Sequence, residues 1–173
     1  IGCPTLYQNC TQKAKAVQED INALTGLGNC DLFICDIGSH ASIKNFAKEI
    51  RMRYNHIDVL INNAGLAKGL DLIHEGKLED WETMLDTNVK GLLYMTKLIS
   101  AGMVRRKSGH IINVCSTAGK EVYPKGNVYC ASKHAVDAIS KAMRIGLLRH
   151  SIKVTAIHPG AAETEFSMVR FRG

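Results

Sequence analysis

Hydrophobic residues along this chain occur in two patterns that alternate with each other. Short continuous apolar runs are typical of buried strands, and apolar residues recurring three and four positions apart are typical of helices. Continuous apolar strands separated by helices indicate a doubly wound α/β fold, in which helices cover both faces of a mostly parallel sheet. The predicted strands cover 31–35, 59–61, 110–114 and 153–157, and the predicted helices cover about 11–24, 43–50, 78 to at least 92, and 128–149.

Small and polar residues mark the ends of several predicted helices. Gly26 and Gly28 follow the first helix, where glycine can adopt the left-handed conformation that ends a helix. Ser39 or Ser42 is in position to cap the next helix. Residues 1–10 are interpreted as the remnant of a further strand, although Pro4 suits a central strand poorly. The chain has no internal repeat and no obvious linker, so we expect a single domain over 1–173.

The charge and hydropathy of the chain exclude two classes of partner. The formal net charge is +6, but the basic residues are spread along the sequence, whereas a nucleic-acid-binding protein would concentrate them. We therefore expect a solvated basic surface that helps to attract an anionic cofactor, and no nucleic-acid partner. No apolar run approaches the ~18 residues that a membrane span requires, so we expect no membrane association.

The six cysteines form no CxxC pair, and no histidine or carboxylate lies near them at the spacing of a metal site. We interpret them as buried thiols of a reduced compartment rather than as disulfides, and we expect a cytoplasmic protein without a metal.

Polar and small residues follow each predicted strand. Ligands of parallel α/β sheets bind outside the carboxyl ends of the strands, so the residues at these four positions would meet along one edge. A single such segment is ordinary turn chemistry, but four in register indicate a site. The segments are Asp36-Ile37, Asn62-Asn63-Ala64-Gly65, Cys115-Ser116-Thr117-Ala118-Gly119 and His158-Pro159-Gly160.

The most specific pair is Tyr129 and Lys133, which share one face of a predicted helix because they are four residues apart. A free tyrosine has a pKa near ~10, and a neighbouring ammonium lowers it by favouring the phenolate. The pair can therefore act as a general acid/base toward an alcohol. The alternative is an amphipathic helix on which both side chains merely reach the surface. Ser116, at a strand end, could return beside this helix and bond a substrate oxygen.

Taken together, the motifs resemble those of the short-chain dehydrogenase/reductase family, which has a Rossmann-like fold. They run in the family's order over nearly all of residues 10–173. Two further stretches, 79–84 and 166–171, resemble the NADP-dependent 3-hydroxy acid dehydrogenases of bacteria. The matching residues are Asp36-Ile37, Asn62-Asn63-Ala64-Gly65, Asn88, Ser116 before Thr117-Ala118-Gly119, Tyr129 with Lys133, and Pro159-Gly160 with Thr164.

The resemblance implies a catalytic set of Asn88, Ser116, Tyr129 and Lys133. Tyr129 would exchange a proton with the substrate oxygen while a hydride moves to or from the nicotinamide. Lys133 would lower the Tyr129 pKa and bond the nicotinamide ribose, and Ser116 would orient the substrate. Asn88 would hold a water that connects Lys133 to solvent, and its alternative is an ordinary polar residue within a helix.

The same resemblance implies a cofactor-binding set at the strand ends. Asp36 would accept a hydrogen bond from the adenine amino group while Ile37 packs on the ring. The turn at Asn63, Ala64 and Gly65 would let the backbone pass the adenosine ribose. Tyr129 and Lys133 would also contact the cofactor, and Pro159, Gly160 and Thr164 would flank its carboxamide and pyrophosphate. The subfamily resemblance favours NADP, and NAD stays possible.

One element of the family pattern is missing. The dinucleotide fingerprint requires a strand, a glycine-rich turn and then a helix, whereas Gly26-Leu27-Gly28 follows a helix. The family's sheet would then lack strands at its centre. We expect either a fragment, a sequence with unlisted residues, or a chain that needs a partner, and we expect the isolated chain to be inactive and aggregation-prone.

The function expected from these residues is an NAD(P)-dependent oxidoreductase acting on a small hydroxy acid or the corresponding carbonyl compound. Family members pair through helices, so we expect a homodimer or homotetramer. The alternatives are a catalytically inactive binding module of the same family and a sugar-nucleotide epimerase or dehydratase, which also uses a YxxxK pair.

Overall fold

The computed structural model describes residues 4–26, 28 and 30–160, with side chains described from residue 12 onward. Two compact units divide the chain, Ile1–Cys35 and Asp36–Gly173. Helix α1 (Pro4–Thr25) forms most of the first unit. The predicted helix over 11–24 is thus confirmed but begins earlier, so the interpretation of residues 4–10 as a strand remnant is wrong. Proline is tolerated in the first turn of a helix, where its missing N–H would have had no partner.

The glycines after α1 end the helix, as predicted. Gly26 has a φ of +65° and its N–H donates to the carbonyl of Asn22 at 2.9 Å. Gly28 is also left-handed, with a φ of +59°. These glycines form a C-cap turn, and a helix rather than a strand precedes them.

The strand predicted over 31–35 is absent. The structure gives these residues no regular secondary structure, and no described residue forms a ladder with them. An apolar run becomes a strand only when a neighbouring strand takes up its backbone N–H and C=O groups. The apolar pattern predicted a buried strand, but none of residues 31–35 is fully buried and Ile34 is 51% exposed.

The second unit contains a parallel sheet in the order β1 (Val59–Asn62), β2 (Gly109–Val114) and β3 (Ile152–Ile157). In its register Val59 lies opposite His110 and Gly109 lies opposite Ile152. All three strands were predicted, and their parallel arrangement is confirmed. Because the strands are parallel, their carboxyl ends meet at one edge.

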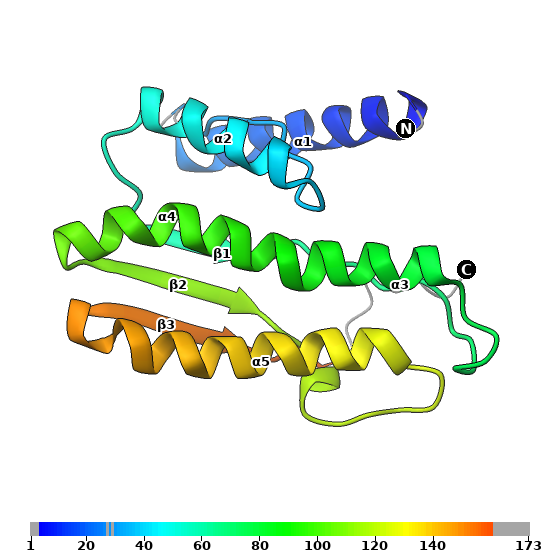
Figure 1. The fold of residues 1–173 in the computed structure, drawn as a ribbon. Helices are drawn as coiled ribbons and strands as arrows, with labels where there is room; N and C mark the ends of the chain where they lie inside the picture. Colours follow the sequence, from blue (N-terminus) through cyan, green and yellow to red (C-terminus); the bar gives the residue numbers. More distant parts are fainter. Residues whose placement is uncertain (1–3, 27, 29, 161–173) are drawn as a thin grey trace. The chain divides into compact units, whose positions relative to one another are not determined.

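Helices α4 (Leu92–Arg106) and α5 (Asn127–Leu147) lie over the same face of the sheet, α4 along β1 and α5 along β3 (Figure 1). Met103 of α4 packs there with Ile111, Ile152 and Val154 of the strands. On the opposite face Val59 and Ile61 are about half exposed. Helix α2 (His40–Arg53), with Ser39 as its N-cap, packs against α4.

Helix α3 (Leu78–Leu85) continues into α4 through a π-helical segment, Asp86–Gly91. The long helix expected from near Leu78 is therefore interrupted by a wider turn. Such segments are frequent at functional sites, and this one contains Asn88. Short 3₁₀ turns, Thr117–Gly119 and Leu148–His150, precede and follow α5.

Two amides, Asn62, which is half-buried, and Asn113, which is buried, hold β1 and β2 in register. Asn62 and Asn113 are register partners, and Asn62 Nδ2 donates to Asn113 Oδ1 at 2.9 Å. Asn62 also donates to Thr96 of α4 at 3.0 Å, and Asn113 donates to Ser140 of α5 at 2.8 Å. A slip of one residue would turn an amide to the other face, away from these partners. The network therefore aligns the strand ends that carry the site.

Candidate active site

Tyr129 and Lys133 lie one turn apart on α5, and both are buried, with exposed fractions of 7% and 6%. The Lys133 ammonium nitrogen is 5.9 Å from the centroid of the Tyr129 ring. The predicted shared face is therefore present. The ammonium therefore lies beside the ring of Tyr129.

Lys133 reaches from α5 toward the end of β2, where its Nζ donates to the carbonyl of Val114 at 3.1 Å. Burial lowers the pKa of Lys133, and Cys115 opposes this effect in part. Cys115 is itself fixed beneath the helix, because its Sγ donates to the Lys133 carbonyl at 3.1 Å, and burial raises the pKa of its thiol. The ammonium is thus held at the junction of β2 and α5.

Asn88, in the π-helical segment, joins three parts of the site. Its Oδ1 accepts from the N–H of Leu66 at 2.8 Å, and its Nδ2 donates to the carbonyl of Leu66 at 2.9 Å. The second Nδ2 hydrogen is donated to Ser132 Oγ at 3.0 Å. Both amide hydrogens therefore bond protein groups, and Asn88 fixes the backbone that follows β1.

Ser132 was not among the residues predicted for the site. It is fully buried, and its hydroxyl accepts from Asn88 and donates to the carbonyl of Tyr129 at 2.8 Å. It thereby connects the π-helical segment to the first turn of α5. A serine three residues after Tyr129, on the buried side of an amphipathic helix, was the available signal.

Ser116 lies two residues after the end of β2 and caps the 3₁₀ turn Thr117–Gly119, its Oγ accepting from the N–H of Ala118 at 3.1 Å. The turn packs tightly on α5. A Cβ at Gly119 would lie 2.7 Å from the carbonyl oxygen of Lys133. Only glycine permits this approach, which brings the Ser116 turn against the helix of Tyr129 and Lys133.

Gly65, one of the predicted cofactor residues, lies close to Lys133 and Asn88. A Cβ there would be 3.3 Å from Lys133 Nζ and 3.4 Å from Asn88 Oδ1. Asn63 and Ala64, just before it, are exposed. The backbone of the turn after β1 therefore lies close to the Lys133 ammonium, with no side chain of Gly65 between them.

Of the other predicted cofactor residues, Pro159 and Gly160 follow β3, whereas Asp36 and Ile37 follow a segment that is not a strand, contrary to the prediction. Asp36 is exposed, and its Oδ1 accepts from the N–H of Gly38 at 2.9 Å. Ile37 packs so closely on Gly91 that a Cβ at that glycine would lie 2.4 Å from Ile37 Cγ2. The carbonyl of Pro159 accepts from the N–H of Thr117 at 3.0 Å. Gly160 is exposed, and Thr164 lies outside the described residues.

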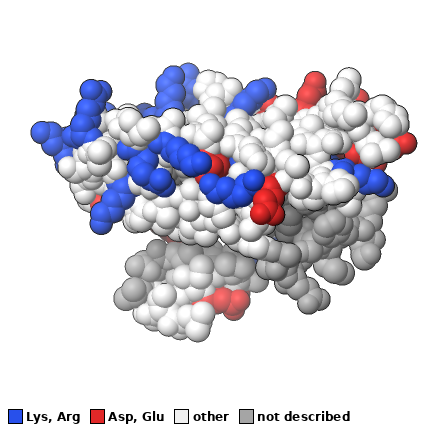
Figure 2. Space-filling model, turned by 90° about the horizontal axis from the view of Figure 1, so that it is seen from below, with Lys and Arg blue, Asp and Glu red and all other residues white. Residues whose placement is uncertain are grey.

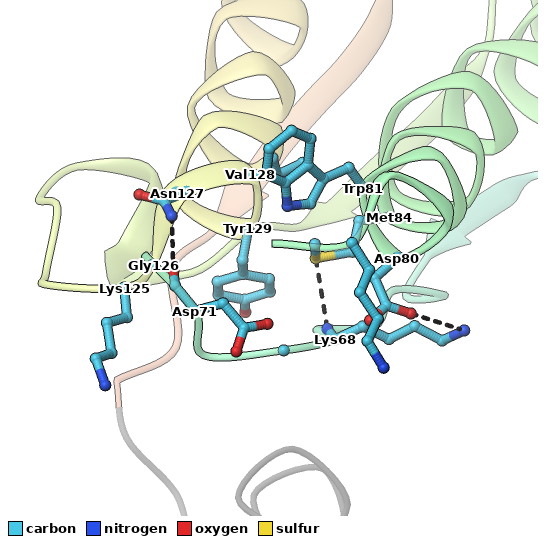
Figure 3. Close-up of a pocket in the computed structure, with 12 residues that line it drawn as sticks. Lys68, Asp71, Asp80, Trp81, Met84, Lys125, Gly126, Asn127, Val128 and Tyr129 are labelled. Atoms are coloured by element: carbon cyan, nitrogen blue, oxygen red, sulfur yellow. Dashed lines mark hydrogen bonds and ion pairs between the residues drawn. The ribbon is translucent and has the colours of Figure 1, made fainter. Parts of the chain in front are cut away.

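A pocket adjoins Tyr129, and the sequence did not predict the residues that form it. Figure 3 shows the Tyr129 side chain directed into the pocket, toward the loop that carries Lys68 and Asp71. Lys68 pairs with Asp80 at 3.7 Å, and Asn127 Nδ2 donates to the carbonyl of Asp71 at 2.8 Å. Its lining is Lys68, Gly69, Asp71, Lys77, Asp80, Trp81, Met84, Lys125, Gly126, Asn127, Val128 and Tyr129.

The wider surface adds little to the site. On the face shown in Figure 2, lysine and arginine side chains occur in separate groups with acidic side chains among them. Among the described residues, no three His, Cys, Asp or Glu side chains gather as a metal site. Within the same residues, no helix has both the length and the apolar character needed to cross a bilayer.

The short chain dehydrogenase model matches residues 4–172, which is almost the entire chain. The chain belongs to the short-chain dehydrogenase family. It is 45% identical over 159 residues to the NADP-dependent 3-hydroxy acid dehydrogenase YdfG of Shigella flexneri, a match that covers 90% of this chain and 64% of that protein. A dehydrogenase of the same description from Schizosaccharomyces pombe is 39% identical and is covered over 53% of its length.

Solved structures of the family superpose well on the chain. The closed form of serine dehydrogenase complexed with NADP⁺ matches with a TM-score of 0.78 and 45% identity, covering 90% of this chain and 64% of that one. A metagenomic short-chain oxidoreductase in complex with NADP matches with a TM-score of 0.81 and 29% identity, covering 87% and 67%. The Rossmann-like α/β fold expected from the motifs is therefore confirmed. The chain spans only part of these relatives, between 53% and 67% of their lengths.

Proposed function

We propose that this chain carries the catalytic part of an NADP-dependent oxidoreductase that interconverts a small secondary alcohol and its ketone. The observation that carries the proposal is the buried Tyr129–Lys133 pair beside a pocket. A buried ammonium without a carboxylate partner is costly, and among the described carboxylates none contributes to the pKa of Lys133. Because this buried charge costs stability, a catalytic role explains its presence better than a structural one.

The described residues fit a nicotinamide dinucleotide. Lys133 Nζ has three hydrogens, of which the described structure assigns one to Val114, so two donors suit the ribose hydroxyls. Gly65 leaves the approach to that ammonium narrow and free of a side chain. In this proposal Asp36, Ile37, Asn63, Ala64, Gly65, Pro159, Gly160 and Thr164 hold the rest of the cofactor. When bound, NADP gives or takes the hydride.

Tyr129 is the general acid/base of the proposed reaction. In the reductive direction its hydroxyl gives a proton to the substrate oxygen, and in the oxidative direction its phenolate removes one. The Lys133 ammonium favours the phenolate electrostatically. The Ser116 hydroxyl orients the substrate oxygen, and Asn88 holds the backbone beside Lys133, where a water could pass protons to solvent.

A 3-hydroxy acid is the proposed substrate class, with NADP preferred to NAD. The relatives described as 3-hydroxy acid dehydrogenases support this choice. The pocket supports it chemically, because three lysines line it against two aspartates, Asp71 and Asp80, so that with Lys68 paired to Asp80 the lining keeps a net positive charge that can attract a carboxylate. We also propose that 1–173 belongs to a single domain, since the family match runs through both compact units, and that the protein is a cytoplasmic homodimer or homotetramer.

The test is the substitution Tyr129→Phe in the naturally produced protein. Turnover is assayed by nicotinamide absorbance with a panel of small 3-hydroxy acids that includes serine. We expect turnover to fall by ~10²–10⁴-fold, the usual effect of losing a general acid/base, with NADPH binding measured by fluorescence unchanged. Tyr94→Phe is the matched control, because that ring lies on α4 against His40. Turnover of Tyr129→Phe within threefold of the wild type would refute the assignment. NADPH binding without oxidation of any alcohol by the wild type would favour an inactive binding module.

A further inference from the structure

Asp137 lies on α5 one turn beyond Lys133, and three side chains from different segments converge on its carboxylate. Lys120 donates to it at 2.9 Å, Lys141 lies 2.7 Å away, and His158 Nε2 lies 3.3 Å away. The hydrogen bonds from Lys120 and then Lys141 lower the pKa of Asp137 to about 2. The side chain is only 11% exposed, so α5 carries a nearly buried anion one turn beyond the catalytic pair.

His158 spans the space between this anion and Ser116. It follows β3 directly, and its Nδ1 lies 3.1 Å from the Ser116 carbonyl oxygen while its Nε2 faces Asp137. Both partners are hydrogen-bond acceptors. Each contact is a hydrogen bond when the ring nitrogen that faces it carries a proton.

The Ser116 carbonyl is bonded from two directions. Within its own turn it accepts from the N–H of Gly119 at 2.9 Å, and His158 Nδ1 lies 3.1 Å from the same oxygen. The N–H of Cys115 donates to the Ile157 carbonyl at 2.7 Å, and the N–H of Thr117 donates to the Pro159 carbonyl at 3.0 Å. These bonds extend the β2–β3 pairing on either side of Ser116. His158 adds a side-chain bond to the intervening carbonyl, beside the one made by the turn.

We propose that His158 is a positioning residue that holds the Ser116 carbonyl, and through it the placement of the Ser116 hydroxyl. This inference rests on the proposed function, in which Ser116 contacts the substrate oxygen. It adds to that function a row of groups, Asp137, His158 and the Ser116 carbonyl, that connects the helix of the general acid/base to the strand end of the orienting serine.

Two substitutions of His158 separate its two contacts. An asparagine amide nitrogen lies about where Nδ1 of histidine lies, so His158→Asn keeps a donor toward Ser116 and loses the contact to Asp137. A glutamine amide nitrogen reaches about as far as Nε2, so His158→Gln keeps a donor toward Asp137 and loses the bond to Ser116. A role through Ser116 requires His158→Asn to behave like the wild type, whereas a simple tether of β3 to α5 requires His158→Gln to do so.

The experiment measures the ¹³C resonance of the Ser116 carbonyl, which reports a hydrogen bond to that oxygen, in the isotopically labelled chain. We expect a wild-type resonance in His158→Asn and a displaced one in His158→Gln. Lys141→Gln is the control, because Lys141 contacts Asp137 and is 60% exposed, and it should leave the resonance unchanged. The opposite order of the two His158 variants, or a wild-type resonance in both, would overturn the proposal. If His158→Gln does not fold, His158→Ala decides, since it also removes the donor toward Ser116, and a wild-type resonance in that variant would overturn the proposal.

Turnover provides a second and separate readout. We expect kcat to fall at least tenfold in His158→Gln and to stay within threefold in His158→Asn, with KM for the cofactor unchanged in both. Loss of kcat in both variants with an unchanged carbonyl resonance would overturn the positioning role. Full turnover in Ser116→Ala would instead refute the assignment of Ser116 within the proposed function. The carbonyl resonance would still decide whether His158 holds the Ser116 carbonyl.

Discussion

Gly119→Ala tests how the turn that carries Ser116 is seated on α5. The added Cβ would lie 2.7 Å from the Lys133 carbonyl oxygen and 2.9 Å from both the Lys133 carbonyl carbon and Cys115 Sγ. Ordinary contact begins at 3.4 Å, so the turn would have to retreat by about 0.7 Å, the difference between 3.4 and 2.7 Å. Two of the three obstructing atoms belong to the helix backbone and cannot move aside alone.

The expected cost follows from overpacking at this buried position. An extra carbon in a well-packed interior destabilises by ~1–3 kcal/mol, and here the retreat would also lengthen the bond from Cys115 Sγ to the Lys133 carbonyl. We expect unfolding to require about 2 kcal/mol less free energy than in the wild type. Because a misplacement of ~1 Å at a reacting centre can reduce turnover by ~10²-fold, we also expect at least a tenfold loss of kcat.

Urea denaturation followed by circular dichroism at 222 nm measures the change. The matched control is Gly146→Ala on the same helix, where a Cβ meets nothing within 4 Å. That substitution should stabilise the chain by about 0.5 kcal/mol, because alanine restricts the unfolded backbone more than glycine does. Equal effects of the two substitutions on stability, or a Gly119→Ala chain as stable as the wild type, would refute the close seating of the turn.

Three further substitutions test the charged and buried polar groups. Asp137→Asn should lose roughly 1 kcal/mol of stability at pH 7. The pKa of Asp137 falls from 3.8 to about 2, each pKa unit corresponds to roughly 1.4 kcal/mol, and the product is halved because the lysine partners are about half exposed. Since the pKa is lowered in the folded state, this contribution is present above pH 4 and disappears as the pH falls toward 2. Urea denaturation at pH 7 and pH 2.5 measures it, and an equal difference in stability between the variant and the wild type at both pH values would contradict the prediction. Lys133→Met removes an unfavourable contribution to stability rather than a favourable one. Burial lowers the pKa of this lysine, so its charge costs stability at neutral pH, and the cost fades as the pH rises toward 10.5. The stability of Lys133→Met relative to wild type should thus decrease between pH 7 and pH 10, and a pH-independent difference would argue against a desolvated ammonium. Asn88→Asp keeps the shape but turns a carboxylate oxygen toward the Leu66 carbonyl, so we expect at least ~2 kcal/mol of destabilisation in urea, and near-neutrality would mean that the amide bonds are dispensable.

Periodicity along the sequence determined most of the elements. The strands β1, β2 and β3 and the helices α1, α2 and α5 were predictable because a buried face imposes its spacing on nearby residues. The pairing of Tyr129 with Lys133 was predictable for the same reason, since residues four apart on a helix share a face whatever surrounds them. Ser39 as an N-cap and Gly26 as a C-cap are equally local, each depending on its own turn of the chain.

Contacts between distant segments were decided only by the tertiary structure. The apolar run 31–35 has the composition of a strand, but a strand exists only when another one pairs with it. Ser132, a plain serine in the sequence, became part of the site because Asn88, forty-four residues earlier, reaches its hydroxyl. The pocket beside Tyr129 and the row from Asp137 through His158 to Ser116 likewise join segments that carry no mutual signal along the chain. Hydrophobic spacing reports how each element faces the core, whereas the partners of a buried polar group depend on which elements the folded chain packs together.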